Sequence, residues 1–215
     1  MKASHFLLAP NLLSLSRILL TPLVGYLLAQ NDVLSVYFCV GVLLVAVSTD
    51  ALDGWLARKL NQQTELGLYL DPLADKLFAA VLLSLLVIYR DLPLWLAALI
   101  VGRDFLILLT GLLAVKARSI TLPSNVTGQY TFFAVVVLVT FYVIRFDFGA
   151  TLATIATVCL VLASLANYGR RFYLIMRGRP APVFHDRPVY KWLRIGLTAL
   201  LLSLCLVMFI LENWS

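Results

Sequence analysis

The chain has 215 residues, of which 62% are hydrophobic and 13% are charged, and its mean hydropathy is +0.95. Soluble domains are about half apolar and a quarter charged, so these values exclude an ordinary soluble protein and predict a membrane protein. A net charge of +6 would suggest nucleic acid as the partner of a soluble protein, but in a membrane protein it reports topology, and we predict no nucleic-acid partner.

Seven apolar runs follow one another along the chain, and each approaches the roughly 20 residues that one helix needs to cross a bilayer. They cover about residues 12–30, 33–49, 67–89, 92–115, 129–146, 148–168 and 192–211. None alternates as the strand of a membrane barrel does, so each is predicted to be a helix. The predicted fold is therefore all-α, a polytopic integral membrane helix bundle.

Two longer connections, 116–128 and 169–194, are predicted to be loops at a membrane surface. We divide the chain into a transmembrane domain over 1–175, a basic cytoplasmic loop over 176–191 and an extra C-terminal transmembrane helix over 192–215. The last segment is open to three roles: a lipid-facing accessory helix, a dimer contact or an anchor.

The basic residues predict the orientation of the bundle, because they collect on the cytoplasmic side of a membrane protein. A cytoplasmic N-terminus places on that side Arg58, Lys59, Lys116, Arg118 and the basic residues of segment 170–194. Mainly Arg90 and Arg145 then remain outside. The Arg-rich segment 170–194 is interpreted as a topology signal that also attracts anionic lipid, and a binding site for a phosphorylated substrate is the alternative.

Four of the eleven acidic residues fall on two predicted helices, at Asp50, Asp53, Asp71 and Asp75. At about 100° per residue, each pair shares one face of its helix. Antiparallel neighbours joined by a turn over 59–66 would bring all four carboxylates together near the cytoplasmic surface. Clustered oxygen ligands without His or Cys suit Mg²⁺, Mn²⁺ or Ca²⁺. The alternative is a buried ion pair of Asp50, Asp53 and Arg58 that stabilises the bundle.

Small residues share the faces of these aspartates. Gly54, Ala57 and Gly67 leave the polar faces without bulk, so a flat or phosphorylated ligand could approach the backbone closely. Pro72 follows Asp71 directly, and a proline disfavours the α conformation of the residue before it. The third helix is therefore predicted to start or kink at Asp71.

The stretch resembles the signature of the CDP-alcohol phosphotransferase family, Asp-x₂-Asp-Gly-x₂-Ala-Arg-x₈-Gly-x₃-Asp-x₃-Asp. Every fixed position is matched, by Asp50, Asp53, Gly54, Ala57, Arg58, Gly67, Asp71 and Asp75. Flanking features agree, since the segment from Pro10 to Pro22 looks like the family's first helix, and Gly102-Arg103-Asp104 resembles the Arg-acid pair of its bacterial phospholipid synthases. The likeness covers about residues 10–175, or six helices, so the seventh would be an addition.

The resemblance implies an enzyme of phospholipid biosynthesis that transfers the phosphatidyl group of CDP-diacylglycerol to an alcohol and releases CMP. It implies that Asp50, Asp53, Asp71 and Asp75 hold two Mg²⁺ or Mn²⁺ ions, with Asp75 also the base toward the acceptor hydroxyl. It implies that the CDP moiety binds at Gly54, Ala57, Arg58 and Gly67. It further implies a homodimer in a membrane, with the active site facing the cytoplasm, and we expect a bacterial inner membrane.

The acceptor follows less directly from the resemblance. The nearest branch is that of phosphatidylglycerophosphate synthases and eukaryotic-type cardiolipin synthases, so glycerol 3-phosphate or phosphatidylglycerol is expected. That branch carries a lysine in the loop before the fifth helix, and the corresponding stretch from Ser124 to Thr131 has none. If that lysine holds an acceptor phosphate, its absence favours a neutral or lipid acceptor.

Several charged residues are open to two interpretations. Arg103 and Asp104, neighbours that are not expected to face each other on a helix, either serve the site or pair across helices for stability. The same two possibilities hold for Arg17 and Lys76. Lys116 and Arg118 are orientation signals or an acceptor-phosphate site, and His5 and His185 are expected to be solvated. A divalent-cation carrier or channel that uses the intramembrane aspartates is the alternative function.

Overall fold

The computed structural model describes the backbone of residues 9–30, 32–59, 67–118 and 126–178 and of three single positions, 196, 203 and 207. Side chains are described at 20–30, 32–46, 75–111, 113, 126–178 and the same three positions. Six helices are assigned: α1 (Ala9–Gln30), α2 (Val33–Lys59), α3 (Gly67–Tyr89), α4 (Leu94–Arg118), α5 (Val126–Val143) and α6 (Asp147–Met176). No described residue lies in a strand, which confirms the all-α prediction.

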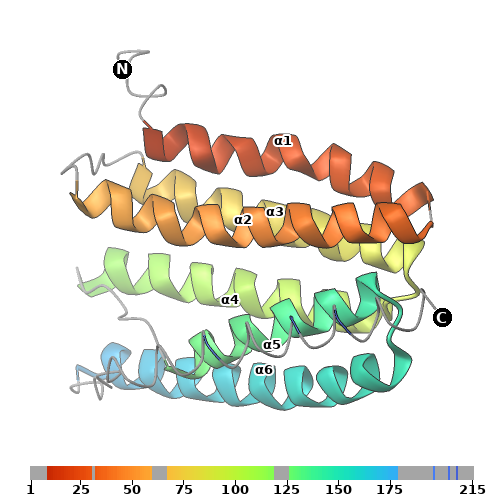
Figure 1. The fold of residues 1–215 in the computed structure, drawn as a ribbon. Helices are drawn as coiled ribbons and strands as arrows, with labels where there is room; N and C mark the ends of the chain where they lie inside the picture. The colour runs from red at the N-terminus through yellow and green to blue at the C-terminus, as the bar shows by residue number, and fades with distance from the viewer. Residues whose placement is uncertain are drawn as a thin grey trace. The chain divides into compact units, whose positions relative to one another are not determined.

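The chain divides into two compact units, residues 1–92 and 93–215. In the first unit, α1 packs against both α2 and α3, and its core includes Val24, Leu28, Cys39, Leu83 and Leu86. In the second unit, α6 packs against both α4 and α5. Successive helices within each unit run in opposite directions (Figure 1).

The second helix ends at Lys59, at the start of the turn predicted over 59–66. Other helices continue into segments predicted to be loops: α4 ends at Arg118 and α5 begins at Val126, inside the predicted loop 116–128, and α6 ends at Met176 rather than near 168. The added residues are mostly good helix formers, and a helix does not need to end where its apolar stretch ends. The third helix begins at Gly67, so a start at Asp71 was wrong, while a kink there stays a prediction.

The turn between α1 and α2 shows how a short polar connection starts a helix. The Ser35 amide donates to a carboxylate oxygen of Asp32 at 3.1 Å, and this carboxylate thereby satisfies an amide in the first turn that has no partner within the helix. Hydrogen bonds from the Ser35 side chain and backbone lower the pKa of the exposed Asp32 carboxyl.

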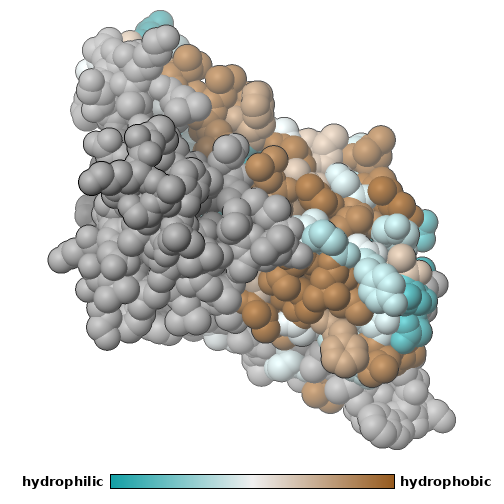
Figure 2. All heavy atoms as spheres, turned by 90° about the horizontal axis from the view of Figure 1, so that it is seen from above, coloured by the Kyte–Doolittle hydropathy of each residue, from teal (hydrophilic) through white to brown (hydrophobic). Residues whose placement is uncertain are grey.

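Hydrophobic side chains lie outward on both units, as expected for a protein surrounded by lipid. Residues such as Leu34, Phe38, Leu94, Phe105 and Phe148 are each more than half exposed. Hydrophobic residues dominate the coloured surface in Figure 2, and hydrophilic ones collect toward its edge. Among the described residues, three helical stretches are long and apolar enough to cross a membrane, Leu94–Gly111, Val126–Val143 and Asp147–Met176.

A close contact at the start of α6 yields a stability prediction. A Cβ at Gly149 would lie 2.9 Å from a ring carbon of Phe141 and closer still to the Phe146 ring. These rings meet edge to face, with centroids 5.5 Å apart, so neither can retreat freely. We expect Gly149→Ala to cost about 1–3 kcal/mol through overpacking, measured as a lower thermal unfolding midpoint in detergent.

Gly111→Ala on α4 is the matched control, because a Cβ there would have no neighbouring atom within 4 Å. Alanine is also the better helix former, so this variant should unfold at or above the wild-type temperature. A Gly149→Ala protein that melts no lower than Gly111→Ala would contradict the close contact.

Candidate functional site

The signature residues occupy the last turns of α2 and the first turns of α3. Because α2 and α3 run in opposite directions, the end of one and the start of the other lie at the same end of the first unit (Figure 1). The side chains at Asp50, Asp53, Gly54, Ala57, Arg58, Gly67 and Asp71 lie outside the described residues. Asp75 is described and half-buried on α3. The end of α2 and the start of α3 thus lie at one end of this unit, as the predicted site requires. The convergence of the four carboxylates stays a prediction.

The donor set at this end fits a hard divalent cation. The signature offers carboxylates alone, with no His or Cys from Asp50 to Asp75, and Mg²⁺ prefers such oxygen ligands. Among the side chains that the structure describes, no three His, Cys, Asp or Glu residues come together, but three of the four signature aspartates lie outside that set.

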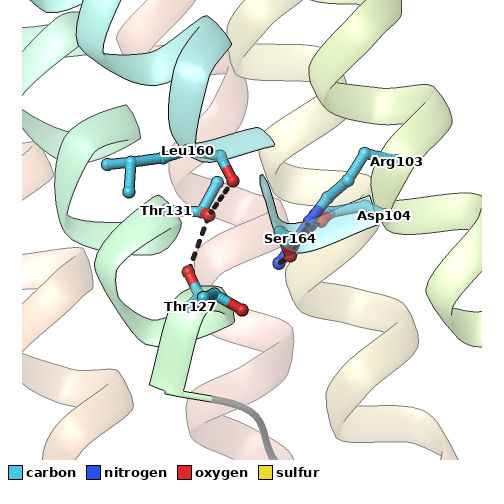
Figure 3. A network of polar contacts seen from close by, with 6 residues as sticks. All are labelled: Arg103, Asp104, Thr127, Thr131, Leu160 and Ser164. Carbon is cyan, nitrogen blue, oxygen red and sulfur yellow. Dashed lines mark hydrogen bonds and ion pairs between the residues drawn. The ribbon is translucent and has the colours of Figure 1, made fainter. Parts of the chain in front are cut away.

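A second polar cluster lies inside the second unit, centred on Arg103 of α4. Its side chain extends toward α6, where Nη2 and Nε donate to the Ser164 hydroxyl oxygen at 2.7 and 3.3 Å (Figure 3). Nη1 contacts the Asp104 carboxylate at 2.5 Å. Arg103 is 8% exposed and Ser164 fully buried, so a charge-assisted contact joins α4 to α6 in the interior.

The contact between Arg103 and Asp104 corrects a sequence-based expectation. Adjacent residues on a helix point in different directions, and these two were not expected to face each other. The long arginine side chain reaches around the helix surface, so its Nη1 meets Asp104 while the rest of the guanidinium faces Ser164. Burying a cation at membrane depth costs about 2.5–3.5 kcal/mol on insertion scales, and the neighbouring carboxylate offsets part of this cost.

The first turns of α5 are hydrogen-bonded to α6 next to this cluster. The Thr131 hydroxyl lies 2.8 Å from the Thr127 carbonyl oxygen and 3.2 Å from that of Leu160 on α6 (Figure 3). The Asn167 amide of α6 lies 3.5 Å from the Thr127 hydroxyl. Polar contacts of this kind join helices in a membrane, where apolar packing alone gives little preference over lipid.

Gly128 brings the same part of α5 against Arg103. A Cβ at Gly128 would lie 3.2 Å from Arg103 Nη2 and 3.6 Å from the Tyr168 hydroxyl, which is tighter than an ordinary van der Waals contact at the guanidinium. The absence of a side chain at 128 therefore allows α5 to approach the guanidinium closely. Three helices meet at this one cation.

Buried arginines also change the interpretation of the basic segments. Arg171 is 1% exposed on α6, although 169–194 was predicted to be a surface loop; residues 169–176 are helical, so that prediction was wrong for this part. Arg90, which charge counting assigns to the non-cytoplasmic side of the membrane, has a side chain that is buried, 4% exposed, just after α3. The charge of a residue does not by itself predict whether its side chain is buried, because the aliphatic stem of a long basic side chain can turn into the protein interior.

The residues around Arg103 that sequence reasoning missed are uncharged. Ser164, Thr131, Thr127, Asn167 and Gly128 lie inside or beside apolar runs and were not assigned a role. Their signal is spacing, since 164, 167 and 171 recur at helical intervals on the face of α6 that meets its neighbours.

Other predicted residues lie outside the described side chains, namely Arg17, Lys116, Arg118, His5 and His185. Lys76 is half-buried beside Asp75 on α3. Of the predicted seventh helix, only Gly196, Ser203 and Val207 are described, each in helical conformation, so that helix stays a prediction. The domain boundaries near 175 and 191 also remain predictions.

Comparison with known proteins gives a family match over most of the chain. Residues 7–166 match the family model of CDP-alcohol phosphatidyltransferases. The chain is 42% identical over 124 residues to a CDP-diacylglycerol--glycerol-3-phosphate 3-phosphatidyltransferase of Aquifex aeolicus, covering 57% of this chain and 67% of that protein. It is 33% identical over 207 residues to a probable CMP-forming cardiolipin synthase of Drosophila melanogaster, covering 93% and 56%.

The human CMP-forming cardiolipin synthase is 36% identical over 172 residues, with 77% of this chain and 54% of that protein covered. The chain thus spans little more than half the length of the cardiolipin synthases. The names of these relatives belong to the two groups of enzymes whose sequences this chain's motif resembles, the phosphatidylglycerophosphate synthases and the cardiolipin synthases.

Proposed function

Because the chain belongs to the CDP-alcohol phosphatidyltransferase family, we propose that it transfers the phosphatidyl group of CDP-diacylglycerol to an alcohol acceptor and releases CMP. One observation carries the proposal: the complete eight-residue signature lies at the end of the first unit where α2 ends and α3 begins. The alternative of a cation carrier has no support among the relatives, whose names describe transferases and synthases.

The roles follow the signature. Asp50, Asp53, Asp71 and Asp75 would hold two Mg²⁺ or Mn²⁺ ions, and the CDP moiety would bind at Gly54, Ala57, Arg58 and Gly67. Bound cations supply neutralisation of the pyrophosphate charge and stabilisation of the departing CMP. An all-carboxylate donor set supports this assignment, and the small residues leave space for the nucleotide.

Asp75 is proposed to take the proton from the acceptor hydroxyl. The acceptor oxygen forms a bond to the phosphorus that carries diacylglycerol, the bond from that phosphorus to the CMP oxygen breaks, and CMP leaves with the electron pair. Transfer of this type depends on positioning and charge neutralisation. The protein therefore needs no nucleophile of its own, and a carboxylate on a rigid helix suffices as the base.

The acceptor is proposed to be glycerol 3-phosphate or phosphatidylglycerol. Relatives named for glycerol 3-phosphate and for cardiolipin synthesis both match the chain. The missing lysine before α5 favours the lipid acceptor, since one cation fewer is available to a free phosphate at that place.

The membrane setting is proposed from charge. The basic residues near the ends of α2 and α4 favour a cytoplasmic location for those ends, so the active site would face the cytoplasm, in a bacterial inner membrane. The resemblance further supports a homodimer.

An acceptor panel tests the function. Purified protein in detergent, given CDP-diacylglycerol and Mg²⁺ or Mn²⁺, is expected to release CMP with glycerol 3-phosphate or phosphatidylglycerol, and not with inositol phosphate or serine. Lipid products identify the acceptor. Absence of CMP release with every acceptor, especially with cation flux into liposomes, would refute the proposal and favour a carrier.

A further inference from the structure

Helix α6 is longer than one membrane crossing needs. Its 30 residues give a length of about 45 Å at roughly 1.5 Å per residue, whereas the hydrocarbon core of a bilayer is about 30 Å thick. An ordinary tilt of about 20° shortens the projected length by only about 3 Å. Residues 148–166 carry no charge and suffice for the crossing, so the last turns of the helix, from Arg170 on, lie at the depth of the lipid headgroups.

One face of these last turns points away from the neighbouring helices. Arg170 and Arg177 are exposed, and Tyr173 between them is 53% exposed. Their spacing of three and four residues places all three on one stripe of the helix, which continues toward the hydrocarbon through the exposed Leu162. Arg171 is buried, so the stripe does not include it.

The Arg177 guanidinium lies over the aromatic ring of Tyr173, with its carbon 4.6 Å from the ring centroid. A guanidinium stacked in this way keeps its N–H groups in one orientation, so less freedom is lost when an anion binds. The end of the helix is closed by the backbone rather than by these side chains. The amides of Arg177 and Gly178 donate to the carbonyl oxygens of Tyr173 and Ile175 at 3.2 and 2.9 Å.

The positive charge of this face has no acid to balance it within the described part of the second unit. From residue 93 to residue 178 the sequence has only two acids. Asp104 is paired inside the unit, and Asp147 starts α6 at the opposite end of the helix. Beside Arg170 the surface is open, because a Cβ at Gly169 would meet no atom within 4 Å. Two cations therefore face the headgroup layer without a counterion among the described residues.

We propose that Arg170, Tyr173 and Arg177 form a binding site for an anionic phospholipid whose headgroup carries no ammonium group, such as phosphatidylglycerol. Arginine binds phosphate oxygens through two parallel N–H donors, the tyrosine hydroxyl donates a further hydrogen bond, and an acyl chain lies along Leu162. Two arginines repel an ammonium group, so phosphatidylethanolamine and phosphatidylcholine are weaker ligands. The site shares no residue with the signature and does not depend on the proposed reaction.

Crosslinking by a photoactivatable phosphatidylglycerol tests the site in the full chain. The protein is reconstituted in phosphatidylcholine vesicles that contain a rising fraction of the probe, and labelling of the fragment with residues 162–177 is quantified by mass spectrometry. Arg170→Gln and Arg177→Gln are each expected to raise the half-saturating fraction about fivefold, as loss of one interfacial charge does. Arg145→Gln is the matched control, because it removes an exposed arginine after α5, and it should label as the wild type does.

Two further variants distinguish a specific site from general attraction between charges. Arg177→Lys keeps the charge but loses the planar pair of donors. Tyr173→Leu keeps both arginines and removes the ring that orients one of them. Each should raise the half-saturating fraction about threefold, as loss of an exposed cation–π contact does. If charge alone attracted the lipid, both variants would label as the wild type does.

Competition on the wild-type protein decides the headgroup without any substitution, so a variant that fails to fold does not prevent the test. Unlabelled phosphatidylglycerol should reduce labelling of this fragment, whereas phosphatidylethanolamine, or inorganic phosphate at equal ionic strength, should not. Equal competition by phosphatidylethanolamine, wild-type labelling of folded Arg177→Lys and Tyr173→Leu, or an equal loss in Arg145→Gln would overturn the site. CMP release is not measured here, so failure of the proposed function would leave this result standing.

Discussion

Replacing Asp75 by asparagine is expected to abolish CMP release while leaving the protein folded and able to bind CDP-diacylglycerol. Asparagine has the same shape, but it cannot accept the proton of the acceptor hydroxyl and is a neutral, weaker ligand for a cation. Loss of a general base alone costs about 100- to 10,000-fold in rate, and the changed ligand set adds to this. Turnover is measured as CMP release, and binding as thermal stabilisation by the CDP-lipid.

Asp91→Asn is the matched control for this variant. Asp91 is exposed after α3 with φ of 56°, a left-handed conformation that asparagine also adopts readily. The same carboxylate-to-amide change there should leave turnover and stability at the wild-type values. Full activity of Asp75→Asn would remove Asp75 from the base role, and unfolding of that variant would assign the residue to stability instead.

The positions of the helices could be predicted from the sequence because membrane crossing imposes a length. Apolar runs of about 20 residues have few alternatives in lipid, and the apolar run 67–89 coincides with the observed third helix, Gly67–Tyr89. Helix ends were less predictable. The sixth helix continues to Met176, past the end of its apolar run near 168, because Arg, Leu and Met favour helix whether or not they lie in hydrocarbon.

A candidate site can be proposed from sequence only where a pattern of residue types has few chemical uses. Four aspartates with small residues at helical intervals have few purposes other than cation and nucleotide binding. The Arg103 cluster has no such pattern, since a serine, a glycine and two threonines are common in membrane helices for packing. Their role depends on which residues of other helices they meet, and that is a property of the tertiary structure.

Removal of divalent cations should abolish activity, and this prediction tests the donor set directly. EDTA treatment is expected to reduce CMP release to background, because without divalent cations most of the positive charge that neutralises the pyrophosphate and the carboxylates around it is lost. Added Mg²⁺ or Mn²⁺ should restore turnover, whereas Zn²⁺, a borderline cation that favours four-coordinate sites with nitrogen and sulfur ligands, should restore it poorly at an all-oxygen site.

The assay needs a control for loss of structure, because carboxylates that lose their cations repel one another. The chelated protein should keep its helical circular dichroism, and readdition should restore activity without refolding. Mg²⁺ should also raise the unfolding temperature of the wild-type protein, since a ligand bound only to the folded state stabilises it, and raise that of Asp75→Asn less. Turnover that survives the chelator would refute the metal assignment of the four aspartates. The pyrophosphate would then need another source of positive charge, and Arg58 and Lys76 would be the first residues to test.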